Sequence, residues 1–93
     1  MIVFASEAIL DFERLHRFLE IKDPNAAARS MRAIWTKLEL LEHMPGLGRK
    51  TASPSVRKIA VKFGSWGYVV RYSVREPDGA LVVLRIWHGR ELR

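Results

Sequence analysis

The spacing of the apolar residues changes once along this chain, and that change limits the folds open to it. Up to about residue 44, apolar side chains recur every three or four positions, which is the period of a helix. From residue 56 onward they alternate with polar ones, which is the period of a strand. Pro45-Gly46 lies between the two patterns and ends a helix. The chain is therefore predicted to form helices first and most of its sheet afterwards.

The first helix is predicted over about 6–21. Residues 2–5 (IVFA) form a short apolar strand before it, and Ser6 stands where an N-cap would open the helix. Its apolar face consists of Ile9, Phe12, Leu15 and Leu19. The charged residues Glu7, Asp11, Glu13, Arg14 and Arg17 are expected on its other faces.

A second helix is predicted to begin at Asp23-Pro24, an N-cap followed by a proline at the first helical position, and to end before Pro45. The short link predicts an antiparallel helical hairpin. The apolar residues of this helix step by four, three, four and three positions: Ala27, Met31, Ile34, Leu38 and Leu41. This heptad-like seam could form a dimer interface, but in so small a chain we expect it to cover the chain's own sheet.

Three strands are predicted after the loop GLGRKTASPS, over 56–62, 68–74 and 81–88. Gly64-Ser65 and Glu76-Pro77-Asp78-Gly79 are the turns between them. Short links join neighbouring strands in antiparallel fashion. The expected fold is α+β, in the order β-α-α-β-β-β, with an N-terminal strand and a helical hairpin packed on an antiparallel β-sheet in one domain, 1–93.

The composition excludes several kinds of site. The chain has no cysteine, which removes disulfides, thiolate nucleophiles and cysteine-based zinc sites. The three histidines do not have metal-ligand spacing, and no acidic cluster suggests a hard cation, so we expect neither a metal nor another cofactor. No apolar run approaches the roughly 20 residues that cross a bilayer, and the N-terminus lacks the pattern of a signal peptide. We expect a cytoplasmic protein that makes no membrane contact.

The net positive charge of the chain comes entirely from its second half. Residues 1–44 hold six Lys/Arg and seven Asp/Glu, a net of −1, whereas residues 45–93 hold ten and three, a net of +7. Such a field favours an anionic partner, either nucleic acid or an acidic protein segment. The alternative is a basic face that serves solubility alone.

Arg71 and Arg85 each alternate with apolar residues in their strands. These apolar sets are Tyr68, Val70 and Tyr72 in one strand, and Val82, Leu84 and Ile86 in the other. If the even-numbered residues face the helices, both arginines face away from them. Arg57 in the preceding strand and Arg49 in the loop are further candidates for a shared basic surface that binds a target or a phosphate. His88 and Arg90 are expected to project from the end of the sheet.

A metal-independent ribonuclease is physically possible with these residues. Such a reaction needs a proton acceptor for the 2′-OH, cations for the charge of the transition state, and a proton donor for the leaving oxygen. His88 could transfer the proton while Arg49, Arg57, Arg71 and Arg90 hold the phosphate. A lone histidine at a strand end is, however, more often a structural residue. The aromatic residues Phe63, Trp66 and Trp87 could stack on bases or complete the core.

The assembled motifs resemble the ParE/RelE superfamily of bacterial type II toxins, the small basic partners of plasmid-borne and chromosomal toxin–antitoxin modules. FASEAILDFERLHRFL is similar to the strand-then-helix opening of this superfamily. DPNAAARSMRAIWTKLELLEHMPGLGR resembles its most recognisable segment, from the start of the second helix to Arg49. VRKIAVKFGSWGYVVRYSV and LVVLRIWHGRE are similar to its arginine-led hairpin and to its closing strand with a His-x-Arg ending. The resemblance covers nearly the whole chain.

The resemblance implies a cognate antitoxin with an acidic or amphipathic tail, and one of two targets. RelE-like members cut mRNA on the ribosome, whereas ParE-like members act on DNA gyrase without being nucleases. The MPGLGR loop and the IWHGRE ending, with no tyrosine after His88, are closer to the ParE side. We therefore expect a gyrase inhibitor without catalysis of its own, in which Arg90 and His88 contact the target. A RelE-like endoribonuclease, in which His88 and Arg90 are catalytic, is the first alternative, and a non-toxic homologue that binds only an antitoxin is the second.

Overall fold

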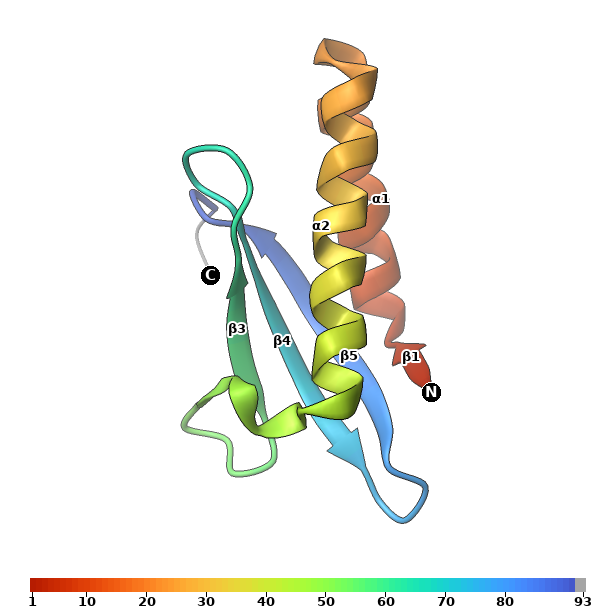
Figure 1. Ribbon diagram of the computed structural model, residues 1–93, viewed down its shortest axis with the longest axis vertical. Coiled ribbons are helices and arrows are strands. Elements are labelled where there is room, and N and C mark those ends of the chain that lie inside the picture. The colour runs from red at the N-terminus through yellow and green to blue at the C-terminus, as the bar shows by residue number, and fades with distance from the viewer. Residues whose placement is uncertain (92–93) are drawn as a thin grey trace.

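The computed structural model describes residues 1–91 and has two helices covering one face of a five-stranded sheet (Figure 1). The strand order across the sheet is β1-β5-β4-β3-β2. This arrangement is the α+β fold that the sequence predicted. Along the chain the elements are β1 (Ile2–Phe4), α1 (Ser6–Lys22), α2 (Pro24–His43), the 3₁₀ turn η1 (Pro45–Leu47), β2 (Arg49–Lys50), β3 (Arg57–Val61), β4 (Tyr68–Arg75) and β5 (Ala80–His88).

The sheet is mixed, which corrects the prediction of an antiparallel one. β2, β3, β4 and β5 pair in antiparallel fashion, but β1 pairs with β5 in parallel, with Ile2 opposite Leu81 and Phe4 opposite Val83. The two strands of this parallel pair lie at opposite ends of the chain. No local sequence pattern therefore indicates whether they run parallel or antiparallel to each other. β2 was also missed, because its two residues lie inside a loop-like run of Gly, Ser and Pro.

The two helices begin differently. Asp23 caps α2 as predicted, since its side chain accepts hydrogen bonds from the backbone N–H groups of Asn25 and Ala26. The predicted cap of α1 is wrong: Ser6 is already helical and its hydroxyl donates to Glu7. Ala5 is the N-cap, because its N–H still continues the sheet by donating to the carbonyl oxygen of Val83 at 2.9 Å. Neither helix is long and apolar enough to cross a membrane.

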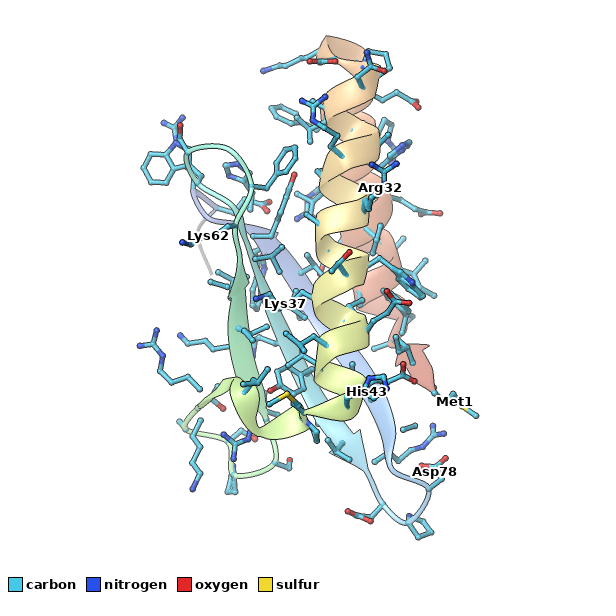
Figure 2. The ribbon with its side chains drawn as sticks, in the orientation of Figure 1. Met1, Arg32, Lys37, His43, Lys62 and Asp78 are labelled. Atoms are coloured by element: carbon cyan, nitrogen blue, oxygen red, sulfur yellow. The ribbon has the colours of Figure 1, made fainter. Side chains whose placement is uncertain are left out.

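The seam of α2 packs against the sheet, as expected of a helix that covers its own core. Ala27, Ile34, Leu38 and Leu41 are buried, and Met31 is partly buried. The sheet side of the same core is made by Val61, Tyr68, Val70, Tyr72, Leu81, Val83 and Ile86. At the far end of α2, near the labels of His43 and Met1 in Figure 2, the N-terminal ammonium pairs with Glu42.

The buried face of α1 matches the predicted one only in part. Leu15 is buried and Phe12 packs against the core as predicted, but Ile9 is 47% exposed, and Ala8 and Asp11 are buried as well. Asp11, which we expected on a charged outer face, is only 3% exposed. An aspartate is rarely buried unless its charge is paired, so its partners have to come from another element.

A β-bulge changes the side-chain parity of β5. Arg71 lies opposite Arg85, but the next residue, Tyr72, lies opposite Val83, so Leu84 is the extra residue. Ile86, beyond the bulge, faces the core as predicted. Before the bulge the prediction is wrong, because Leu81 and Val83 are buried while Val82 and Leu84 are only partly buried. One inserted residue therefore exchanges the two faces of half a strand.

Candidate functional site

Four cationic residues lie side by side across four strands. Arg49 on β2 is paired with Lys58 on β3, Lys58 with Arg71 on β4, and Arg71 with Arg85 on β5. Residues directly opposite one another project from the same face, and these alternate with the residues that face the helices. We call these four residues the basic row. With neighbouring strands about 4.8 Å apart, the row spans about 14 Å on the open face of the sheet.

Trp87 lies next to the basic row. The guanidinium carbon of Arg85 is 5.0 Å from the centre of the Trp87 ring, and that of Arg71 is 6.0 Å away. These are cation–π distances. Lys62, just after β3, extends away from α2 and adds positive charge to this side of the molecule (Figure 2).

Arg85 also reaches around the edge of the sheet to Asp11 on α1. β1 ends at Phe4, so the edge of β5 beyond Val83 has no neighbouring strand there. The Asp11 carboxylate takes that place, accepting from the backbone N–H of Ile86 at 2.9 Å and from Arg85 Nε at 2.8 Å. Burial by itself would raise the pKa of Asp11, but the hydrogen bonds from Arg85, the Ile86 N–H and Arg14 outweigh it and hold this pKa below its usual 3.8.

The ionic contacts continue from Asp11 to the C-terminal segment. Arg14 Nη1 donates to Asp11 at 2.9 Å, and Arg14 Nη2 donates to both oxygens of Glu91 at 3.0 and 2.9 Å. Glu91 also accepts from the backbone N–H of His88 at 2.6 Å. Arg85, Asp11, Arg14 and Glu91 thus alternate in charge. They connect the basic row to the segment that follows β5.

His88 lies on the other side of the sheet from the basic row. It is opposite the buried Tyr68, and the two rings meet edge to face with centroids 5.7 Å apart. Its Nδ1 accepts a hydrogen bond from the backbone N–H of Arg90 at 3.1 Å. The closing Gly89 is required by space, because a Cβ there would lie 2.5 Å from the carbonyl oxygen of Trp66.

His88 and Arg90 line a groove of about 690 Å³ between α1, the β3–β4 loop and the end of β5. We call it the tip groove. Arg90 lies over the ring of Trp66 at 5.1 Å. The remaining lining residues are Arg14, Leu15, Phe18, Leu19, Lys22, Phe63, Gly64, Ser65, Tyr68 and Glu91.

Arg57 has a structural role on the helix side of β3. Its guanidinium donates to the carbonyl oxygen of Gly48 at 2.8 Å. The hydroxyl of Tyr72 holds the same turn, since it donates to the carbonyl oxygen of Pro45 at 2.6 Å and accepts from the Gly48 N–H at 2.8 Å. Arg57 and Tyr72 therefore fix η1 and the start of β2, which carries Arg49.

The predicted site residues fall into three groups. Arg49, Arg71 and Arg85 come together on the open face of the sheet, Arg57 faces the helix side, and His88 and Arg90 line the tip groove. Sequence reasoning missed Lys58 as the member that makes the row continuous, and it missed the ionic partners Asp11, Arg14 and Glu91. The place of Lys58 in the basic row follows from the strand register, which cannot be read from the sequence. The sequence pattern placed Asp11 and Arg14 only among the charged residues expected on the outer faces of the first helix.

This arrangement suits binding to an extended anion better than proton transfer. A proton acceptor and the cations that hold the same phosphate have to lie within hydrogen-bond reach of one reacting group. Here the basic row and His88 are on opposite faces of the sheet. Within residues 1–91, no three His, Asp or Glu side chains lie close enough together to hold a metal ion.

Comparison with known proteins identifies the family. The sequence model of the ParE toxin of the type II toxin–antitoxin system parDE matches residues 2–93. The chain is 41% identical over 83 residues to toxin RelE1 of Caulobacter vibrioides, covering 89% of this chain and 86% of that protein. It is 40% identical to toxin RelE3 of the same organism, with coverages of 89% and 87%.

Solved structures with the same fold come from both branches of the superfamily. A chain of the chromosomal ParDE system of P. aeruginosa superposes with a TM-score of 0.75 at 19% identity, covering 94% of this chain and 92% of that one. A chain of the intact E. coli RelBE toxin–antitoxin complex superposes with a TM-score of 0.66 at 19% identity, covering 100% and 98%. The chain belongs to the ParE toxin family. It is a type II toxin of the ParE/RelE superfamily.

Proposed function

We propose that this toxin arrests growth by binding DNA gyrase through the basic row, without catalysis of its own, and that a cognate antitoxin neutralises it. The observation that carries the proposal is the separation of His88 from the basic row by the sheet. A continuous line of cations on the face of the sheet opposite to His88 can bind a negatively charged surface, such as that of gyrase with its bound DNA. Gyrase acts on DNA in the cytoplasm, so the toxin acts there too.

The row itself supports a binding role. Like charges directly opposite each other on neighbouring strands destabilise a sheet, by a few tenths to about 1 kcal/mol a pair. The basic row contains three such pairs, Arg49 with Lys58, Lys58 with Arg71, and Arg71 with Arg85. Arg85 is offset by Asp11, but Lys58 lies between two other cations. Local destabilisation of this kind is expected at a functional surface.

Ribosome-dependent cleavage of mRNA is the second candidate. The basic row with Trp87 beside it has the cations and the aromatic ring that proteins use on single-stranded nucleic acid. The relatives of about 40% identity are both called RelE toxins. In this reading the proton transfer has to come from a group other than His88, because His88 faces the helices.

A supercoiling assay separates these functions. Purified toxin is incubated with gyrase, ATP and relaxed plasmid, and in parallel with a cell-free translation reaction. We expect loss of supercoiling with wild type, at least tenfold weaker inhibition with the double variant Lys58→Thr, Arg71→Gln, and unchanged inhibition with His88→Gln. The double variant Arg29→Gln, Arg32→Gln also removes two positive charges, both from exposed positions on α2 (Figure 2 labels Arg32), and is the matched control.

Two outcomes would overturn the proposal. Unaffected gyrase together with cleaved message in the translation reaction would move the function to the ribosome. No effect in either reaction, from folded protein that also leaves growth unchanged in cells without antitoxin, would identify a non-toxic homologue.

A further inference from the structure

An apolar patch lies on the outer face of the helical hairpin, far from the basic row. Trp35 of α2 is 43% exposed and stacks on Phe4 with ring centroids 6.1 Å apart. Phe4 also meets Phe12 of α1 edge to face at 5.6 Å, and Ile9, one turn before Phe12, is 47% exposed. These four side chains join both helices into one apolar surface that solvent reaches. We call it the hairpin patch.

Two charges of opposite sign flank Trp35 on α2. Arg32 lies three positions before Trp35 and Glu39 four positions after it, so the three side chains share one face of the helix. A rise of 1.5 Å per residue places each charge about 5 Å from Trp35 along the helix axis. Both side chains are exposed, and within residues 1–91 neither has a hydrogen-bond or ion-pair partner. Figure 2 shows Arg32 on the side of α2 that is turned away from β3.

This order of charges is complementary to itself. If two copies pair about a two-fold axis next to Trp35, their α2 helices run antiparallel, and Arg32 of each copy meets Glu39 of the other. One arrangement thus forms two ion pairs and covers both Trp35 side chains. A partner of a different sequence would not need a cation and a carboxylate at equal distances on either side of the apolar residue. The pattern therefore favours a second copy of the same chain.

The outer face of the hairpin is large enough for a weak dimer. α1 has 17 residues and α2 has 20, so the two helices run side by side for about 25 Å, and together they are about 20 Å wide. Two such faces bury about 1,000 Å² in total, which is the lower limit for a specific interface. We expect a dissociation constant in the micromolar range.

We propose that the hairpin patch binds a second copy of the toxin, with Trp35 next to the two-fold axis and Arg32 of each copy paired with Glu39 of the other. The helices cover only one face of the sheet, and the basic row lies on the open face. The dimer therefore presents two basic rows on its outer sides. Because each copy keeps its own row, pairing is separate from the function proposed above. The variant Arg29→Gln, Arg32→Gln weakens pairing without changing the inhibition of gyrase.

Sedimentation velocity measures the pairing of purified full-length toxin over about 1–200 µM. Arg32→Glu and Glu39→Arg each bring like charges together at both contacts, so each should raise the dissociation constant of the dimer about tenfold or more. The double variant Arg32→Glu, Glu39→Arg exchanges the two charges and should pair within about threefold of wild type. Lys62→Glu makes the same charge reversal at an exposed position on the other side of the molecule (Figure 2) and is the matched control.

A mixture of the two single variants gives the sharpest test. Arg32→Glu has carboxylates at both positions and Glu39→Arg has cations at both, so each repels its own copies and attracts the other variant. We expect the equimolar mixture to form dimers under conditions in which each variant alone is monomeric. Misfolding of either variant would not produce this result.

Three outcomes would overturn the inference. Wild type that stays monomeric at the highest concentration does not pair at all. A dimer that neither single variant weakens uses another face. If Arg32→Glu and Glu39→Arg instead weaken binding of the antitoxin by a toxin that does not self-associate, the hairpin patch serves the antitoxin and not a second copy. Gyrase inhibition, measured on the same samples, reports separately on the basic row.

Discussion

Replacement of Asp11 by alanine is expected to destabilise this toxin more than any exposed change on α1. The carboxylate accepts four hydrogen bonds, two from Arg85, one from Arg14 and one from the backbone N–H of Ile86. It also ties α1 to the part of β5 that has no neighbouring strand. In Asp11→Ala, the buried Ile86 N–H loses this acceptor and two arginines lose their counter-charge.

The size of the effect follows from the exposure of each partner. A buried donor left without its acceptor costs about 1–3 kcal/mol. The side chains of Arg14 and Arg85 are 42% and 41% exposed, so water replaces much of what they lose, and each contributes about 1 kcal/mol or less. We expect a loss of about 3 kcal/mol, which lowers the Tm of a domain of this size by about 15 °C. Asp11→Asn keeps an acceptor for the Ile86 N–H and should lose only about 1 kcal/mol.

Urea unfolding followed by circular dichroism at pH 7 measures these changes in the free energy of unfolding. Glu13→Ala, two residues along α1 and exposed, is the control and should stay within about 0.5 kcal/mol of wild type. The reasoning fails if Asp11→Ala changes stability as little as Glu13→Ala does. It also fails if Asp11→Asn and Asp11→Ala are equally destabilised. In that case, the lost hydrogen bond to the Ile86 N–H would not be the largest contribution to the loss of stability.

Further predictions concern pH, the bulk of one glycine, the core tyrosine and the basic row. Because the folded pKa of Asp11 lies below 3.8, its charge stabilises the protein above the unfolded pKa, and this stabilisation is lost as the pH falls through the folded value. The difference in Tm between wild type and Asp11→Asn should therefore be full at pH 7 and shrink below about pH 4. Gly89→Ala forces a Cβ against the carbonyl oxygen of Trp66 and should lower stability by about 1–3 kcal/mol in urea unfolding; an unchanged midpoint would contradict the close approach. Tyr72→Phe removes the hydroxyl that holds the turn before β2 and should lower stability by about 1–3 kcal/mol, as measured in the same assay. Lys58→Thr relieves repulsion within the basic row and should raise the Tm in low salt but not in 1 M NaCl; equal shifts in both would argue against repulsion.

The sequence by itself determined the local elements and the class of protein. The switch in apolar period located both helices and the last three strands, because each pattern depends only on neighbours within the same element. Asp23-Pro24 capped α2 as predicted, since a cap needs only the next three backbone N–H groups. The motifs that resembled the ParE/RelE superfamily also depend on residue order alone, and the family match confirmed them.

Only the tertiary structure decided which residues share a face. The bulge at Leu84 reversed the parity of β5, and strand register turned three predicted arginines and the unpredicted Lys58 into one row. Parity also assigned His88 to the opposite side, which separates it from the basic row. Asp11 became a buried centre of charge because β1 ends early and leaves the edge of β5 open. These features depend on contacts between residues more than seventy positions apart or on pairing between strands. Neither can be predicted from the pattern of neighbouring residues in the sequence.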